Sequence, residues 1–283
     1  MSTMTVPAVK QRLTGWRLFL MSVLGRAYPR VIGMQRDVTW LVFDVLLPIG
    51  TVAAYVLIYR AVGAPEDYVG FVVIGGAMTA YWLNVLWGMS SQLYWEKEQG
   101  NLALYVMAPA PMMSLLLGMA VGGLFSSTLR ALGVIVLSNW MFDVSYVLVS
   151  FWQLFLVFFL CMAALYGLGM MTSSIFLLLN REAWHLANLA QEPIYLASGF
   201  YFPIRNFPTW VATAASIVPL TLGLDGMRQL VFKSGASLGF ISVKWEIVIL
   251  LILSVLFIAG AKWMLDYMER LAKKEGRLTD TRR

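Results

Sequence analysis

The 283-residue chain contains few charged residues, one cysteine and one histidine. Charged residues make up 13% of it, about half of the roughly 25% found in soluble globular proteins. The single cysteine, Cys161, excludes a disulfide framework and a cluster of thiolate ligands. The single histidine, His185, excludes a histidine-rich metal site such as H-E-x-x-H. We therefore predict that the chain holds no metal ion.

Short motifs that mark common enzymes are also missing. No segment matches the phosphate-binding pattern G-x-x-x-x-G-K-[ST], the nucleophile pattern G-x-S-x-G or a G-x-G-x-x-G that follows a strand. The chain therefore offers neither a loop to cradle a nucleotide nor an activated nucleophile. We predict that it is not an enzyme and binds no cofactor, so that energy for any work comes from a gradient or a partner.

Apolar residues dominate the sequence instead. Hydrophobic side chains make up 60% of the chain, and the segments 68–95, 99–129 and 144–180 carry no charge. A helix needs only about 20 apolar residues to cross a bilayer. The net charge of +6 comes from residues that flank apolar runs, which argues against a nucleic-acid partner. These features predict an all-α polytopic membrane protein whose surroundings are the lipid bilayer.

The pattern predicts six transmembrane helices within residues 38–265 of a single transmembrane domain that covers residues 1–283. The expected spans are Val38–Tyr59, Tyr68–Met89, Met113–Trp140, Val147–Leu178, Ala183–Gly199 and Trp245–Leu265. Six spans place both termini on one side, where 15 of the 21 Lys and Arg residues would lie, against five on the other. Positive charge favours the cytoplasm. We therefore predict a protein of the inner (cytoplasmic) membrane with cytoplasmic tails at 1–37 and 266–283.

The segment before the first span has the periodicity of an amphipathic helix. Between Gln11 and Ala27 apolar residues recur at helical spacing, and Tyr28-Pro29 is expected to end the helix. The apolar positions are Trp16, Phe19, Leu20, Val23, Leu24 and Ala27. We predict a helix that lies in the membrane interface. The alternative is a solvated helix that packs against the rest of the protein.

The polar segment Ser90–Pro111 is predicted to form a turn and a short cytoplasmic helix. Gly100 allows a sharp turn, Asn101 would cap the helix, and Pro109 would stop it. We assign to this segment Glu96, Glu98, Gly100, Asn101, Leu102, Tyr105, Val106 and Pro109. The two glutamates lie near the positive end of the helix, and the three apolar residues share one face. That face suits protein docking, although an ordinary loop lying on the bilayer would have the same pattern.

Polar residues inside the apolar stretches are the remaining candidates. His185, Asn188 and Glu192 are spaced for one helix face, which must meet protein or a transport pathway, or else serve as structural hydrogen bonds between helices. Asp44 and Arg130 are intramembrane charges that we suggest pair across spans one and three, unless Asp44 lies at the interface.

The stretch Phe200–Val231 is broken by prolines and is predicted to be re-entrant, or alternatively a plain external loop. Within it, Asp225 and Arg228 are three residues apart and can form an ion pair.

Two of these segments resemble a known family. The run from Glu96 to Leu102, with Ala108-Pro109 and Gly118 after it, is similar to the cytoplasmic loop of type-two ABC transporter permeases, the six-span membrane subunits of drug, lipid and polysaccharide exporters. Residues 198–210 and 218–228 resemble that family's segment before the last span. The chain departs from the family pattern at four positions. Where other family members often have a basic or acidic residue, this chain has Ala103, Pro111, Met112 and Met119.

The resemblance implies a half-transporter. A second permease subunit, identical or related, would pair with this chain, and two copies of a separate ABC ATPase would hydrolyse Mg-ATP. The helix within 102–108 would be the coupling helix seated on the ATPase, and 200–231, with Asp225 and Arg228, would form the external gate. The candidate pathway residues are Asn188, Glu192, Tyr195, Tyr201 and Phe202.

We accordingly expect an exporter of an amphipathic or hydrophobic compound, a drug or a lipid. One alternative within the same fold is export of a lipid-linked polysaccharide, with sugar rings stacked on Tyr81, Trp82, Tyr201 and Phe202. The other alternative is a gradient-driven carrier or channel that has no ATPase.

Overall fold

The computed structural model describes residues 15–36, 38–179 and 182–275, and the regular secondary structure within these residues is helical. Fourteen helical elements follow one another there: α1 (Gly15–Arg36), α2 (Val38–Ala61), α3 (Asp67–Leu83), the π-helix η1 (Asn84–Met89), α4 (Gln92–Glu98), α5 (Asn101–Met107), α6 (Met112–Phe142), α7 (Phe151–Leu179), α8 (Glu182–Ala197), the 3-10 turn η2 (Ile204–Asn206), α9 (Thr209–Ala215), α10 (Pro219–Val231), α11 (Gly235–Leu238) and α12 (Val243–Glu275). The all-α prediction is confirmed for this part of the chain.

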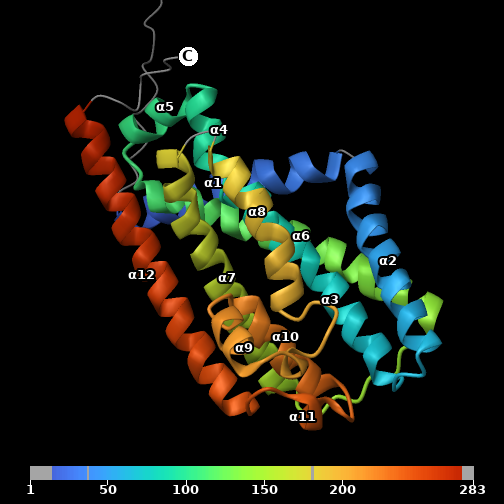
Figure 1. Cartoon of the computed structure of the whole chain (residues 1–283). Coiled ribbons are helices and arrows are strands. Elements are labelled where there is room, and N and C mark those ends of the chain that lie inside the picture. Colours follow the sequence, from blue (N-terminus) through green and yellow to red (C-terminus); the bar gives the residue numbers. More distant parts are fainter. Residues whose placement is uncertain (1–14, 37, 180–181, 276–283) are drawn as a thin grey trace, which may run out of the picture.

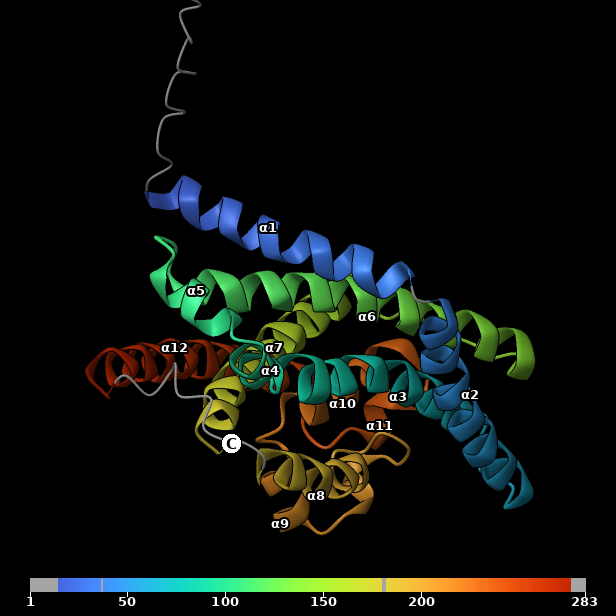
Figure 2. The same ribbon diagram turned by 90° about the horizontal axis from the view of Figure 1, so that it is seen from above.

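The short elements gather at opposite ends of the long helices. Figure 1 shows α1, α4, α5 and the end of α12 at one end of the bundle, and α9, α10 and α11 at the other. Seen from above, α1 runs alongside α6 (Figure 2). Both ends of the described chain therefore lie at the end that carries α4 and α5.

Helix α3 lies at the centre of the bundle. In the most apolar window of the segment Asp67–Glu98, which contains α3, 89% of the residues are buried, against 22% in the corresponding windows of α2 and α12. It packs against α2, α6 and α10, while α12 packs along α7. The central helix is shielded by protein, whereas the two outer helices expose apolar side chains.

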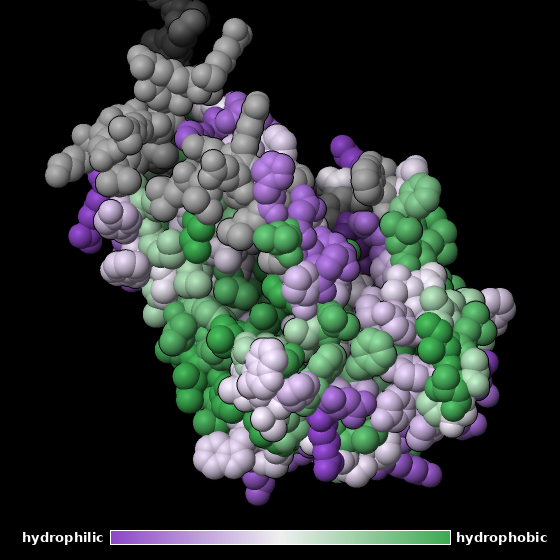
Figure 3. All heavy atoms as spheres, in the orientation of Figure 1, coloured by the Kyte–Doolittle hydropathy of each residue, from purple (hydrophilic) through white to green (hydrophobic). Residues whose placement is uncertain are grey.

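The surface agrees with a membrane environment. Figure 3 shows apolar surface over α12 on one side and over α2 on the other, and hydrophilic surface over α8. Exposed side chains on α12 include Leu251, Ile252, Val255 and Leu256, each at least half exposed. Soluble proteins rarely expose such continuous apolar surface, so these faces are suited to lipid.

Five helical segments of the described chain are long and apolar enough to cross a membrane: Leu41–Ala61, Asp67–Glu98, Met112–Phe142, Phe151–Phe176 and Val243–Arg270. The predicted fifth span corresponds to α8, which has 16 residues and a length of about 24 Å, shorter than a hydrocarbon core of about 30 Å. A count of six is reached only if α9 and α10, bent by 108° at their junction, are taken as one broken span. That bend agrees with the predicted re-entrant segment.

The second span is longer than predicted, because α3, η1 and α4 form one rod of 32 residues. At 1.5 Å per residue this rod is about 48 Å long, so it exceeds the hydrocarbon core by several turns. The surplus contains α4, which the sequence places in the cytoplasmic segment.

Helix α1 does not end at Tyr28-Pro29 as predicted, but continues through Pro29 to Arg36. Tertiary contacts on both sides of the proline hold it: Arg26 pairs with Glu96, and Arg30 donates to the Gly88 carbonyl at 2.7 Å. Residues 11–14 of the predicted helix lie outside the described residues.

The predicted apolar face of α1 is partly buried against the protein and partly exposed. Val23 and Ala27 are buried, while Trp16, Leu20 and Leu24 are at least 41% exposed. The helix therefore packs on α6 along one edge of the face that we predicted for the membrane interface.

Two further boundaries were predicted wrongly. The fourth span begins at Phe151 rather than Val147, because residues 143–150 are not helical and the amides of Val147 and Val149 donate to carbonyls at the end of α10. Helix α12 continues past residue 265 to Glu275. Asp143 ends α6 with a φ of 53° in the left-handed region.

The suggested intramembrane ion pair is present. Arg130 Nη1 on α6 lies 2.9 Å from Asp44 Oδ2 on α2, and both side chains are mostly shielded, at 12% and 29% exposed. The pair joins the first and third predicted spans, as suggested.

Candidate functional site

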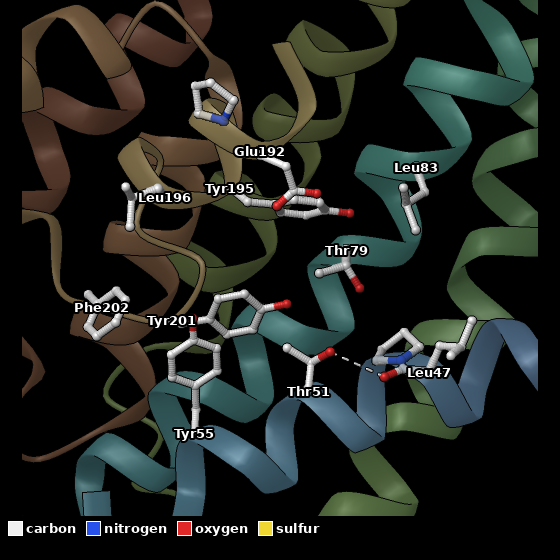
Figure 4. A pocket seen from close by; sticks show the side chains of 12 residues that line it. Leu47, Thr51, Tyr55, Thr79, Leu83, Glu192, Tyr195, Leu196, Tyr201 and Phe202 are labelled. Atoms are coloured by element: carbon white, nitrogen blue, oxygen red, sulfur yellow. Dashed lines mark hydrogen bonds between the residues drawn. The ribbon is translucent and has the colours of Figure 1, made fainter. Parts of the chain in front are cut away.

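A cavity of about 740 Å³ lies between α2, α3, α8 and the segment 200–202 (Figure 4). Its volume is within the range of about 300–1,000 Å³ that is typical of small-molecule sites. The residues that line it are Leu47, Pro48, Thr51, Tyr55, Thr79, Leu83, Glu192, Pro193, Tyr195, Leu196, Tyr201 and Phe202. Their walls are mainly apolar and aromatic, with a few polar groups.

Three polar groups of the cavity lie on α8 and on the segment that follows it. Figure 4 shows the Glu192 carboxylate and the hydroxyl groups of Tyr195 and Tyr201 turned toward the same space. Glu192 is exposed, and its Oε1 accepts a hydrogen bond from Gln191 Nε2 at 3.3 Å. Gln191 in turn accepts one from Trp87 Nε1 at 2.8 Å. This chain of contacts fixes α8 to the centre of the bundle while leaving the carboxylate in the cavity.

Aromatic rings form the wall opposite. Tyr55 stacks on Tyr201 with ring centroids 4.4 Å apart and planes 10° from parallel, and it meets Phe202 edge to face at 5.5 Å. The Tyr59 hydroxyl donates to the Tyr201 carbonyl at 2.8 Å. The rings therefore belong to a fixed cluster that joins α2 to the segment after α8.

Buried Arg228 on α10 holds the backbone of that segment. Its guanidinium donates to the carbonyls of Gly199, Phe200 and Phe71 at 2.6, 2.7 and 2.8 Å. The Phe200 carbonyl can reach it because residue 75 is glycine: a Cβ atom there would lie 1.6 Å from that oxygen. Arg228 and Gly75 thus position the aromatic residues that follow.

The predicted ion pair between Asp225 and Arg228 is therefore wrong. Asp225 Oδ2 accepts from Gln229 Nε2 at 3.1 Å and from the Phe240 amide at 2.8 Å. The two side chains leave α10 toward different neighbours, because Arg228 faces carbonyls of α3 while Asp225 faces the chain that leads into α12. Both are buried, so neither lines the cavity.

Four of the five candidate pathway residues meet in the cavity: Glu192, Tyr195, Tyr201 and Phe202. Asn188 is exposed on α8 outside the lining. The sequence reasoning missed the wall supplied by α2 and α3, above all Thr51, Tyr55 and Thr79. Thr51 and Tyr55 are four residues apart in an apolar span, a polar helical spacing that would have pointed to them.

Two aromatic residues that we considered for stacking on sugars lie elsewhere. Tyr81 and Trp82 are buried in the core, at 3% and 4% exposed, and Tyr81 donates to Thr128 Oγ1 at 3.0 Å. Only Tyr201 and Phe202 of that set line the cavity.

A second candidate site is the helical hairpin formed by α4 and α5 at the opposite end from α10. Gly100 occupies the turn with φ of 76°, in the left-handed region that favours glycine. Asn101 does not cap α5 as predicted, because it is already the first helical residue. Its Nδ2 donates instead to Glu96 Oε2 at 3.1 Å, which ties α5 back to α4. The helix ends at Met107, and Ala108 is extended before Pro109, as a residue that precedes proline prefers.

Buried Glu96 connects three helices. It pairs with Arg26 of α1, accepts from Gln92 Nε2 at 2.9 Å and accepts from Asn101. Arg26 also donates to the Tyr105 hydroxyl at 3.1 Å. Glu96 is therefore a structural organiser of the hairpin, whereas Glu98 on the same helix is exposed.

Several side chains at this junction have perturbed pKa values. Burial lowers the pKa of the Arg30 guanidinium to about 10, so it stays charged at neutral pH. Burial raises the pKa of the Tyr105 phenol, which stays protonated. The contacts that bind α1 to the hairpin are consequently unchanged across the physiological pH range.

The outward apolar face of the hairpin differs from the predicted one. Leu102 is 1% exposed and belongs to the protein's own core, and Tyr105 is half-buried against Arg26. Leu104 and Met107 are 62% and 74% exposed instead. The side chain of Val106 lies outside the described residues. We name Leu104 and Met107 the hairpin surface.

Comparison with known proteins gives one family. Residues 30–232 match the family model of the ABC-2 type transporter, a range that includes the cavity, the hairpin and α10. The chain is 25% identical over 172 residues to the "Probable multidrug ABC transporter permease YbhR" of Escherichia coli K12 and equally to that of Escherichia coli O157:H7. The match covers 60% of this chain and 46% of each relative, so the chain spans about half the length of the relatives it matches.

Proposed function

Because the chain belongs to the ABC-2 type transporter family, we propose that it is the membrane subunit of an ATP-driven exporter of amphipathic or hydrophobic compounds. It is a multi-pass membrane protein by its exposed apolar helices and its family. The proposed assembly has two such subunits, identical or related, in the inner membrane. Two copies of a separate ATPase bind Mg-ATP on the cytoplasmic side.

One observation carries this proposal: the hairpin surface lies at the end of the bundle that is opposite to α10. Leu104 and Met107 project from a short helix that is rigidly tied to α1 through Glu96. Exposed apolar side chains on a well-anchored element are suited to a protein partner. A gradient-driven carrier needs no such docking element, so the hairpin favours the ATP-driven function.

In the proposed mechanism, closure of the two ATPases moves the hairpin and with it α4, η1 and α3, which form one rod. The cavity borders this rod through Thr79 and Leu83. A displacement of α3 relative to α2 and α8 therefore changes the cavity directly. The α9–α10 pair at the far end acts as the external gate, and Arg228 holds its contact with α3. Both termini are proposed to be cytoplasmic.

The test of this proposal is docking of the ATPase. The full chain, tagged and co-expressed with the ATPase of its own host, is purified from wild-type cells and from cells with Leu104→Asp and Met107→Asp. We expect equal amounts of ATPase and wild-type chain, and at least tenfold less ATPase with the double variant, since two charges replace the apolar contact. Gln99→Asp, an exposed polar position in the same turn, is the control and should retain the ATPase.

The variant Leu102→Ala distinguishes loss of docking from loss of protein stability. Loss of a fully buried leucine costs about 2–5 kcal/mol of stability, so this variant should lower the thermal unfolding temperature. The hairpin-surface variants should leave that temperature unchanged. Retention of the ATPase by the hairpin-surface variants would reject docking at this surface.

A further inference from the structure

Glu192 is the one charged side chain among the described residues that line the cavity. It is exposed to the cavity and not enclosed by protein, and its hydrogen-bond donor is the neutral amide of Gln191. Within the part of the chain that the structure describes, no Lys or Arg lies within 4 Å of its carboxylate. The cavity therefore carries a net negative charge.

The arginines nearest to the interior are already committed to other groups. Arg26 pairs with Glu96, and Arg130 pairs with Asp44. Arg30 donates to the Gly88 carbonyl, and Arg228 donates to three carbonyls. A carboxylate placed in a mainly apolar membrane site is costly unless water or a cation compensates it. The compensating cation is thus not supplied by these side chains.

The remaining walls of the cavity also favour a cationic ligand. Tyr55, Tyr195, Tyr201 and Phe202 contribute four aromatic rings to the cavity that the Glu192 carboxylate also lines, and Leu47, Leu83 and Leu196 add apolar surface. The face of an aromatic ring attracts a cation within about 6 Å. Carboxylate and ring faces therefore act together on a positive centre, and the leucines bury an apolar body.

We propose that this cavity binds lipophilic organic cations, with the positive centre at Glu192 and the apolar body against Tyr201 and Tyr55. The cavity's place on an export pathway rests on the proposed function, but binding itself does not. Neutral and anionic compounds of the same size are bound more weakly, because the anion meets the carboxylate without a partner.

The test uses two probes of almost the same shape and opposite charge, tetraphenylphosphonium and tetraphenylborate. Binding of each labelled probe to the purified full chain in phosphatidylcholine nanodiscs is measured and corrected with empty nanodiscs, which removes simple partitioning. We expect saturable binding of tetraphenylphosphonium, at least tenfold tighter than any saturable binding of tetraphenylborate.

Three variants identify the group responsible. Glu192→Gln keeps the shape and should weaken tetraphenylphosphonium binding by about tenfold, since a charge-assisted contact becomes a neutral one. Glu192→Lys should abolish it and create binding of tetraphenylborate. Glu66→Lys, which changes an exposed carboxylate outside the cavity, is the matched control and should bind tetraphenylphosphonium as the wild type does.

Equal binding of the two probes, or tetraphenylphosphonium binding that is unchanged in both Glu192 variants, would overturn the assignment. Neither result would bear on ATPase docking, which is measured separately with the hairpin-surface variants. Conversely, Glu192-dependent binding in a chain that docks no ATPase would support the cation site and reject the export function.

Discussion

Arg228 is buried on α10 and donates hydrogen bonds to three backbone carbonyls that come from α3 and from the segment after α8. A guanidinium can do this because its N–H groups are arranged in a planar fork, whereas a lysine ammonium is a single point on a flexible chain. Phe71 also places its ring 5.4 Å below the guanidinium carbon. This one residue therefore joins the gate helix to the central helix and to the cavity wall.

We predict that Arg228→Lys lowers the free energy of unfolding by about 2 kcal/mol or more, because at least one buried carbonyl loses its donor. Thermal unfolding of the purified chain in detergent measures the loss. Arg205→Lys is the control: Arg205 is an exposed residue at the same end of the bundle, donating to the Ser237 carbonyl, and its replacement should cost far less. Equal unfolding temperatures for wild type and Arg228→Lys would contradict the role given to this residue.

The ion pair between Asp44 and Arg130 leads to a second prediction, which concerns stability. Asp44→Asn and Arg130→Gln should each destabilise the chain, and the double variant should lose less than the sum of the two. Contacting residues typically show a coupling of about 0.5–3 kcal/mol. A double-mutant cycle of thermal stability in lipid nanodiscs measures it, and strict additivity would mean that the two charges do not interact.

At the scale of elements, α1 is fixed to the membrane domain by unusually close packing on α6. A Cβ atom at Gly118 would lie 2.6 Å from the Val23 carbonyl oxygen, and one at Gly122 would lie 3.0 Å from the Ala27 carbonyl oxygen. Small residues four apart allow two helix backbones to approach in this way. The position of α1, and of Arg26 and Arg30 on it, follows from these two glycines.

We predict that Gly118→Ala destabilises the chain by about 1–3 kcal/mol, since the added methyl group overpacks the contact. Gly25→Ala is the control on α1, where a Cβ atom would meet nothing within 4 Å. Alanine has a higher helix propensity than glycine by up to about 1 kcal/mol, so Gly25→Ala should have a free energy of unfolding equal to or higher than that of the wild type. The reverse order of the two unfolding temperatures would refute the close contact.

The long helices could be predicted because each contains a long apolar run with few charges, a signal that tertiary contacts rarely override. Helix ends were harder, as Pro29 shows: a proline disfavours the helix, but contacts made by Arg26 and Arg30 keep α1 intact beyond it. The start of α7 was missed because Val147 and Val149 are apolar yet lie in a non-helical segment whose amides donate to carbonyls at the end of α10.

The site could be predicted in part. Glu192, Tyr195, Tyr201 and Phe202 were found because polar or aromatic residues beside a helix break are conspicuous. The prediction of the exposed hairpin face was wrong, since helical spacing identifies a stripe of residues but does not tell whether it faces the protein's own core or a partner. Leu102 and Leu104 are both leucines of one helix, and only the packing of α5 on its neighbours separates them.

At the scale of the whole molecule, the two ends of the helix bundle differ in composition. The hairpin, α1 and the end of α12 share one end, and α9, α10 and α11 share the other. The bias of Lys and Arg toward the first end predicts that it is cytoplasmic.

Cysteine accessibility tests this orientation. In a Cys161→Ala background, Ala236→Cys should react with a membrane-impermeant thiol reagent on intact cells, because residue 236 is exposed beside α10. Gln99→Cys, exposed in the hairpin turn, should react only after the cells are permeabilised. Labelling in the opposite order would invert the topology and place the hairpin outside the cell.

We propose that ATP hydrolysis by a separate subunit is coupled to this chain through the hairpin surface. Its most direct test is the rate of phosphate release from Mg-ATP in proteoliposomes that contain the chain alone, the ATPase with the wild-type chain, or the ATPase with the Leu104→Asp and Met107→Asp chain. We predict no release by the chain alone, and release by the wild-type complex that is at least tenfold faster than by the variant complex. Phosphate release by the isolated chain, or equal rates in the two complexes, would show that hydrolysis is not coupled to this chain through the hairpin surface.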